Sequence, residues 1–115
     1  MINYHKKLVS TLKTILPTYY ELITNRKMSI PCISYVELSN NANETGDTLG
    51  YSTIQYQIRL YAYSLEELQT YALKIDNALR LIGFKRTGCN EMFDVESTMI
   101  QKIMTFEAKA LEEYK

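Results

Sequence analysis

The sequence is short of the residues that catalytic and metal sites use. Its 115 residues include no tryptophan, one histidine, two cysteines, two prolines and four glycines, and its formal net charge is zero. One histidine and two distant cysteines outside any C-x-x-C pair do not make a zinc site. The glycines form neither a phosphate-binding loop nor a dinucleotide-binding fingerprint. The composition therefore predicts no metal and no cofactor.

The single histidine, His5, lacks the partners of a catalytic site. A Ser/His or Cys/His pair needs the imidazole beside the nucleophile and an orienting acid behind it. Nothing in the spacing places Cys32, Cys89 or a serine next to His5. Cys32 lies in an apolar segment and is expected to be a small buried hydrophobe. We therefore predict that the protein is not an enzyme.

Long apolar runs and an excess of one charge are also missing. No segment approaches the roughly 18 to 20 apolar residues of a membrane span, and the first residues lack the apolar core of a signal peptide. The sequence therefore predicts a protein made in a cytoplasm, with no membrane partner. Zero net charge argues against a protein whose main task is to neutralise phosphates.

The charges are nevertheless unevenly distributed along the chain. Residues 1–30 contain five basic residues and one acidic residue, whereas residues 31–50 contain three acidic residues and no basic one. Opposed patches of this kind suit head-to-tail contacts between copies of the chain. Two alternatives stay open: a solvated surface without function, and a small nucleic-acid-binding module that uses the basic N-terminal segment.

One alternating stretch followed by a capped helix determines the fold class. From Thr53 to Ala62 polar and apolar residues alternate, which predicts a strand with one buried face. Ser64 begins a capping box, in which its hydroxyl accepts a hydrogen bond from the Glu67 amide. A helix over residues 64–82 then ends at Gly83, which is placed as the left-handed residue after it. The apolar stripe of this helix consists of Leu65, Leu68, Ala72, Ile75 and Leu79.

The remaining segments complete an α+β prediction. We expect a helix over residues 4–16, a short strand over 19–23, an inner strand over 30–38, an irregular strand region over 84–95 and a final strand over 98–108. The mixed pattern of the final strand predicts a bulge, or burial on both faces against another subunit. Residues 110–115 are expected to be a short helical or disordered tail. The prediction is a single domain, residues 1–115, with two α-helices packed on a single mostly antiparallel sheet of four to five strands.

Residues 39–50 and the neighbouring tyrosines form the candidate interaction region. The segment is polar and rich in asparagine and glycine, which predicts a flexible loop between two antiparallel strands. Three of the ten tyrosines, Tyr51, Tyr61 and Tyr63, are expected on the polar face of the long strand. Tyrosine suits protein interfaces because it buries area and keeps a polar tip. A platform for single-stranded nucleic acid also needs a basic surround, and only Arg59 lies among these tyrosines.

Several segments together form a pattern of small and aromatic residues over nearly the whole chain. They are an opening helix that ends at Leu16 and Pro17, residues 19–21, 30–35, 56–61, 64–79 and 81–84, a polar loop before Tyr51, and a terminal hairpin that ends near Phe106. This pattern resembles the small tail terminator, or tail completion, proteins of long-tailed bacteriophages.

The resemblance implies a non-enzymatic ring, commonly a hexamer, that caps the finished tail tube and presents it to the head connector. The expected partners are copies of the chain itself, the tail tube protein and the head connector or neck protein. DNA would pass through the ring without specific binding, and assembly in the host cytoplasm would place the protein in the tail or neck of the virion. The alternative in this setting is a neighbouring neck protein that joins head and tail. The candidate subunit or tube interface residues are Asn41, Asn43, Glu44, Asp47, Tyr51, Arg59, Tyr61 and Tyr63.

Overall fold

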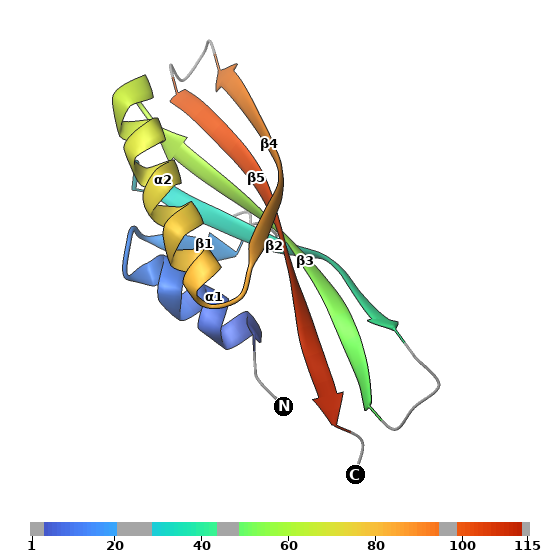
Figure 1. Ribbon diagram of the computed structural model, residues 1–115. Helices are drawn as coiled ribbons and strands as arrows, with labels where there is room; N and C mark the ends of the chain where they lie inside the picture. Colours follow the sequence, from blue (N-terminus) through green and yellow to red (C-terminus); the bar gives the residue numbers. More distant parts are fainter. Residues whose placement is uncertain (1–3, 21–28, 44–48, 95–98, 114–115) are drawn as a thin grey trace.

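The fold is known from a computed structural model, which describes residues 4–20, 29–43, 49–94 and 99–113. The described part of the chain contains two helices and five strands, and Figure 1 shows their arrangement. In chain order they are α1 (Tyr4–Lys13), β1 (Thr18–Tyr20), β2 (Cys32–Asn43), β3 (Leu49–Ala62), α2 (Leu65–Leu81), β4 (Lys85–Asp94) and β5 (Met99–Glu113). The α+β prediction is confirmed.

The strands form one mixed sheet in the order β1-β2-β3-β5-β4. Only the pairing of the short β1 with β2 is parallel, and the other three pairings are antiparallel. The prediction of a mostly antiparallel sheet is therefore confirmed. The predicted inner position of β2 is confirmed as well, because β2 lies between β1 and β3.

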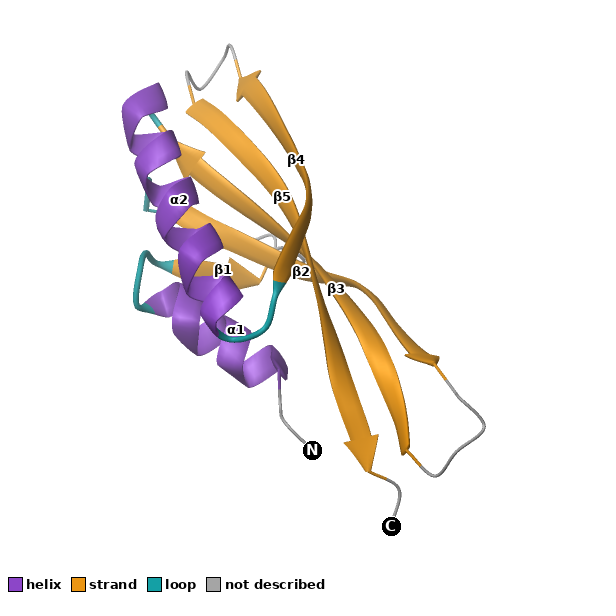
Figure 2. Cartoon of the chain, in the orientation of Figure 1, coloured by secondary structure: helices purple, strands orange, loops and turns teal. Residues whose placement is uncertain are grey.

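The core lies between the sheet and the two helices, which pack on the same face (Figure 2). The alternation in β3 produces this arrangement: its even-numbered residues from Ile54 to Ala62 are buried in the core, and the odd-numbered ones point to the other face. The helix α1 contributes Leu8, Leu12 and the following Leu16, and β5 contributes Met104, Phe106 and Ala108.

The helix α2 begins and ends where its capping residues predict. Ser64 is the N-cap, and its Oγ accepts a hydrogen bond from the Glu67 amide at 3.2 Å. Gly83 follows the helix with φ of 102°, a conformation that glycine adopts without a steric penalty. The predicted burial of Leu65 is wrong, because its side chain is 51% exposed. Leu65 precedes Leu68 by three residues and lies about 60° around the helix from it.

The helix α1 is shorter than predicted. It ends at Lys13 rather than reaching residue 16, and residues 14–16 form a turn. The Ile15 amide donates to the Leu12 carbonyl at 3.0 Å, a tighter pattern than that of the helix itself. This turn leads into Pro17 and β1. Of the strand predicted over residues 19–23, β1 contains 19 and 20, and residues 21–23 lie outside the described residues.

The last two strands confirm one prediction and correct two. The predicted irregular strand region is confirmed as β4, whose register against β5 shifts between Arg86 and Gly88. The predicted bulge in the final strand is wrong, because β5 pairs with β3 without a shift from Ile100 to Glu113. The predicted helical or disordered tail is also wrong for residues 110–113, which belong to β5. Pairing with residues 49–52 of β3 extends the strand.

We predict that Leu12→Ala lowers the free energy of unfolding by about 2–5 kcal/mol, because truncation of a buried leucine leaves a cavity. Leu12 is fully buried between α1, α2 and the sheet. The matched control is Leu73→Ala on α2, whose side chain is exposed and should cost less than about 0.5 kcal/mol. Urea unfolding followed by circular dichroism measures both. Equal losses in the two variants would contradict the location of the core.

Candidate protein interface

The predicted loop over residues 39–50 is mostly strand, so this prediction is wrong. Residues 39–43 continue β2 and residues 49–50 begin β3. The candidate residues Asn41 and Asn43 pair with Thr53 and Tyr51 of β3. Backbone pairing across the two strands overrides the loop preference of asparagine, since strand propensity depends strongly on context. The candidates Glu44 and Asp47 lie outside the described residues.

The strands around this segment form a projecting arm. We define the arm as residues 39–43 of β2, 49–55 of β3 and 107–113 of β5, which pair with one another as a three-stranded ribbon. Figure 1 shows these strands continuing past the helices, which lie over the other part of the sheet. The longest dimension of the molecule is 52 Å, against 28 and 23 Å across it. Apart from Ile54 and Ala108, which are buried in the core, the arm thus extends past the part of the sheet that the helices cover.

Tyr61 lies on the sheet face opposite the helices, but its predicted exposure is wrong. Its side chain is only 7% exposed, and its hydroxyl shares a hydrogen bond of 3.3 Å with the Ser34 hydroxyl. Ser34 is buried as well. The alternation in β3 predicted the face of Tyr61 but not its packing against β2. Its interface role stays a prediction.

The other candidates from β3 have three different environments. Arg59 is half-buried on the same face as Tyr61, and its Nη1 donates to Gln101 Oε1 of β5 at 3.4 Å. Tyr63 follows the end of β3 and is 59% exposed, so its predicted exposure is confirmed. Tyr51 lies in the arm portion of β3, and its side chain is outside the described part of the structure. The fold therefore does not bring Arg59, Tyr61 and Tyr63 into one exposed patch.

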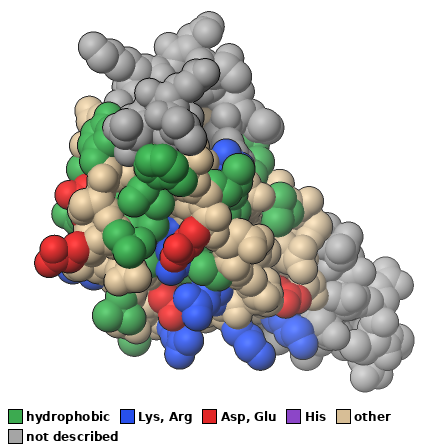
Figure 3. All heavy atoms as spheres, turned by 90° about the horizontal axis from the view of Figure 1, so that it is seen from above, with side chains coloured by type: hydrophobic (Ala, Val, Ile, Leu, Met, Phe, Trp, Pro, Cys, Tyr) green, Lys and Arg blue, Asp and Glu red, His purple; other side chains and the backbone are tan. Residues whose placement is uncertain are grey.

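The end of the molecule opposite the arm carries exposed hydrophobic side chains that the sequence analysis missed. Met92 and Phe93, near the end of β4, are 57% and 60% exposed. Tyr63, directly after β3, and Leu65, the first residue of α2, are exposed at the same end of the sheet, because β3 ends there beside the start of β5. Figure 3 views this end and shows hydrophobic side chains gathered on it. The adjacent Met-Phe pair, flanked by Glu91 and Asp94, was the available sequence signal.

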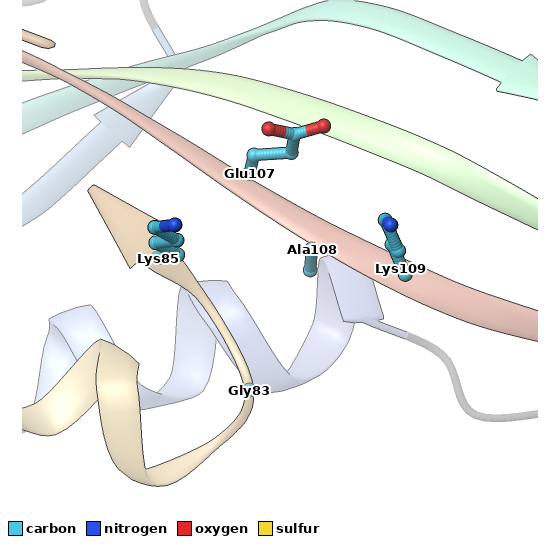
Figure 4. A pocket seen from close by; sticks show the side chains of 5 residues that line it. All are labelled: Gly83, Lys85, Glu107, Ala108 and Lys109. Atoms are coloured by element: carbon cyan, nitrogen blue, oxygen red, sulfur yellow. The ribbon is translucent and has the colours of Figure 1, made fainter. Parts of the chain in front are cut away.

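A shallow hollow lies where α2 passes into β4, beside β5. Its volume is about 590 Å³, and its lining residues are Gly83, Lys85, Glu107, Ala108 and Lys109. Figure 4 shows Lys85 on β4 and Glu107 and Lys109 on β5 around this hollow. Lys85 and Glu107 are register partners across the two strands. The charged residues of this set are two lysines and one glutamate, which can contact charged groups of a partner.

His5 attaches α1 to the sheet. Its Nδ1 lies 3.0 Å from the hydroxyl of Tyr56, which is 1% exposed. The ring centroids of His5 and Tyr35 are 5.8 Å apart in an edge-to-face arrangement. Burial is the main cause that raises the pKa of Tyr56 to about 12, so its hydroxyl stays protonated at neutral pH. These contacts give His5 a packing role between a helix and two strands.

The cysteines and the acidic side chains of the described residues add few candidates for a reactive or metal-binding site. Burial raises the pKa of the Cys32 thiol to about 11, which keeps it neutral and unreactive. Among the described residues, no three histidine, cysteine or acidic side chains lie close enough together to hold a metal ion. Neither described helix combines the length and the apolar character of a membrane span.

We predict that the two thiols differ strongly in reactivity at pH 8. Cys89 is exposed on β4, whereas Cys32 is fully buried with a raised pKa, so only about 0.1% of its thiol would be ionised even if a reagent reached it. An aromatic disulfide reagent should therefore label one thiol per chain quickly and the second only in denaturant. Cys89→Ser is the control and should remove the fast phase. Rapid labelling of that variant would contradict the burial of Cys32.

Comparisons with known proteins give a likeness of fold. No model of a protein family matches the sequence, and no curated protein matches it. A chain in a structure described as the virion of a native gene transfer agent particle matches with a TM-score of 0.62 and 14% sequence identity. The match covers 91% of this chain and 84% of that chain. The arrangement of helices and strands is thus one that a virion chain also uses.

Proposed function

We propose that this chain is a structural protein of a phage or phage-like virion, and that it closes the tail tube as a ring. In this role copies of the chain associate with one another, contact the tail tube protein, and present the finished tail to the head connector or neck protein. DNA passes through the ring without being recognised. The protein is assembled in the host cytoplasm and becomes part of the tail or neck, and a hexamer is the expected ring.

The likeness of fold carries this proposal. A chain of a virion shares the fold across nearly the whole length of both proteins, with a TM-score of 0.62. This supports a structural virion role. The choice of tail terminator among virion roles rests on the resemblance of the sequence pattern described above.

The surfaces of the molecule support an assembly role independently. Exposed apolar side chains gather at one end, around Tyr63, Leu65 and Phe93, and the arm projects from the other end. Contacts between two different surfaces of identical subunits are heterologous, and they close into a ring when the rotation between subunits permits it. A chain with different surfaces at its two ends suits such contacts.

We predict that the purified protein forms one discrete ring and that this ring stops the growth of tail tubes. Light scattering over a concentration series measures the mass, and negative-stain electron microscopy with purified tube protein measures tube length and end structure. The expected result is a hexamer mass, in solution or on tube ends, and shorter tubes with a ring at one end. Heat-unfolded protein is the control. Tubes of unchanged length without terminal rings would contradict the proposal.

A neighbouring neck protein is the alternative within the same assembly. A pull-down against separately purified tube protein and connector protein distinguishes the two roles. A terminator binds the tube protein, whereas a protein that only joins head and tail binds the connector and leaves tube length unchanged.

The basic helix α1 favours one further candidate, a small nucleic-acid-binding module. Lys6, Lys7 and Lys13 are all exposed on α1, and the helix contains no acidic residue. Basic residues of this kind neutralise phosphates without sequence preference, and such binding weakens steeply as salt rises. The neutral total charge of the chain weighs against this function as the main one.

A charge-reversal variant tests this candidate. Changing Lys7 and Lys13 to glutamate should leave ring formation and tube capping intact, because the proposed contacts do not involve α1. If the wild type retards DNA in a gel-shift assay at about 50 mM salt, the variant should lose this binding. A wild type that binds tightly at about 200 mM salt would favour the nucleic-acid function over the structural one.

A further inference from the structure

The two ends of α2 carry opposite charges beside exposed hydrophobic side chains. The first turn contains Glu66 and Glu67, and the last turn contains Arg80. Leu65, at the beginning, is exposed, and Leu81, at the end, is 88% exposed. Charges in this order also stabilise a helix, because its N-terminus is partly positive and its C-terminus partly negative. The charges of α2 alone therefore do not indicate a contact.

The strand β4 repeats this distribution of charge, and a strand has no large dipole to account for it. It begins with Lys85 and Arg86, and it carries Glu91 and Phe93 near its end, all four exposed. Figure 1 shows that β4 runs back along α2, so its basic start lies beside the end of the helix and its acidic end beside the helix start. Both elements thus place acidic residues at one end and basic residues at the other.

The first of these two surfaces lies where α2 begins. Phe93 pairs with Ile100 of β5, which pairs with Ala62 at the end of β3. Directly opposed residues of neighbouring strands lie on one face of the sheet, and both Ala62 and Ile100 pack in the core. Phe93 therefore points to the helix side, where Leu65 is also exposed. We define the acidic end as Tyr63, Leu65, Glu66, Glu91 and Phe93.

A basic residue near the acidic end leaves its character unchanged. Lys102 Nζ lies 3.3 Å from Glu91 Oε1, but the Lys102 side chain is largely buried, whereas that of Glu91 is accessible to solvent. Glu66 is exposed as well. A partner at this end therefore meets carboxylates around exposed hydrophobic side chains.

The second surface lies where α2 ends. The Gly83 amide donates to the Arg80 carbonyl at 3.1 Å, and the Phe84 amide donates to the Leu79 carbonyl at 2.9 Å. These two hydrogen bonds form a Schellman motif, which turns the chain directly from the helix into β4. The last turn of α2 consequently lies close to the start of β4. We define the basic end as Arg80, Leu81, Lys85 and Arg86, all of which are exposed.

Two acidic side chains near the basic end are less exposed than its basic ones. Asp76 forms an ion pair of 3.3 Å with Arg80, but the Asp76 side chain is buried and that of Arg80 is exposed. Glu107 is half-buried. The hollow that Lys85 and Lys109 line adjoins this end. Basic groups around Leu81 therefore determine what a partner meets here.

We propose that the acidic end of one copy of this chain binds the basic end of the next copy. The inference rests on the proposed ring and names its contact. A second copy suits both ends at once, because each end combines an exposed leucine with charges opposite to those of the other. Burial of the hydrophobic side chains supplies affinity, and the charges select the orientation.

The position of the two ends fits a contact that repeats. The helix α2 separates them by about 26 Å, so one copy can bind a neighbour at each end. Because the two surfaces differ, every added copy leaves one surface of each kind accessible until the ring closes.

Charge reversal with rescue tests whether the two ends bind each other. We expect Glu66→Lys and Arg86→Glu each to raise the concentration needed for ring assembly by about threefold or more at about 50 mM salt, because like charges then meet. A chain that carries both changes should assemble nearly as well as the wild type, since opposite charges face each other again. Light scattering measures assembly, and circular dichroism checks the fold.

Substitution of the hydrophobic side chains tests the same contact independently. Leu81→Glu and Phe93→Lys each remove an apolar contact and add a like charge, so each should need at least tenfold higher concentration for assembly. Leu73→Glu is the matched control, because Leu73 is exposed on α2 outside both ends, and it should assemble like the wild type. A mixture of Leu81→Glu and Phe93→Lys retains one intact pair of ends and should form a two-copy complex without rings.

Each other outcome counts against the proposal. If the variants of both ends assemble as well as the wild type, the contact is wrong while the ring itself stands. If the single charge reversals weaken assembly and the double change does not restore it, or if only the variants of one end fail, the two ends do not bind each other. If the wild type forms no ring with or without tail tubes, the proposed function fails and the contact with it.

Should a variant unfold, cross-linking of the assembled wild type decides. A carbodiimide joins a carboxylate directly to a lysine amine, and α2 keeps Glu66 and Lys85 of one chain about 26 Å apart. A cross-link from Glu66 or Glu91 to Lys85 therefore requires two copies. Assembled protein should yield this cross-link, and its absence would overturn the proposed contact.

Discussion

The length of the central strand β3 is the constraint on which the rest of the structure depends. Its 14 residues span about 46 Å at roughly 3.3 Å per residue, whereas the 17 residues of α2 span only about 26 Å. One helix of this length cannot cover such a strand from end to end. The core therefore occupies one part of the sheet, and the remainder projects as the arm, which gives the molecule its long dimension of 52 Å.

The two faces of β3 have different surroundings in the fold. The face that carries Tyr56, Ile58 and Leu60 buries these side chains against α1 and α2. On the other face, Tyr61 bonds to Ser34 and Arg59 bonds to Gln101. These polar contacts are made within the sheet, so the face is stable beside water, as is common in antiparallel sheets. Exposed apolar side chains lie instead at the end of the sheet, around Tyr63, Leu65 and Phe93.

The sequence predicted those parts of the fold that depend on interactions between residues close together in the chain. The alternation in β3, the Ser64 cap and Gly83 each act within a few residues, and all three were confirmed. Residues 39–43 and 110–113 were misread because their strand conformation depends on pairing with β3, not on their own propensities. The burial of Tyr61 was missed for a related reason, since Ser34 lies 27 residues away in the chain.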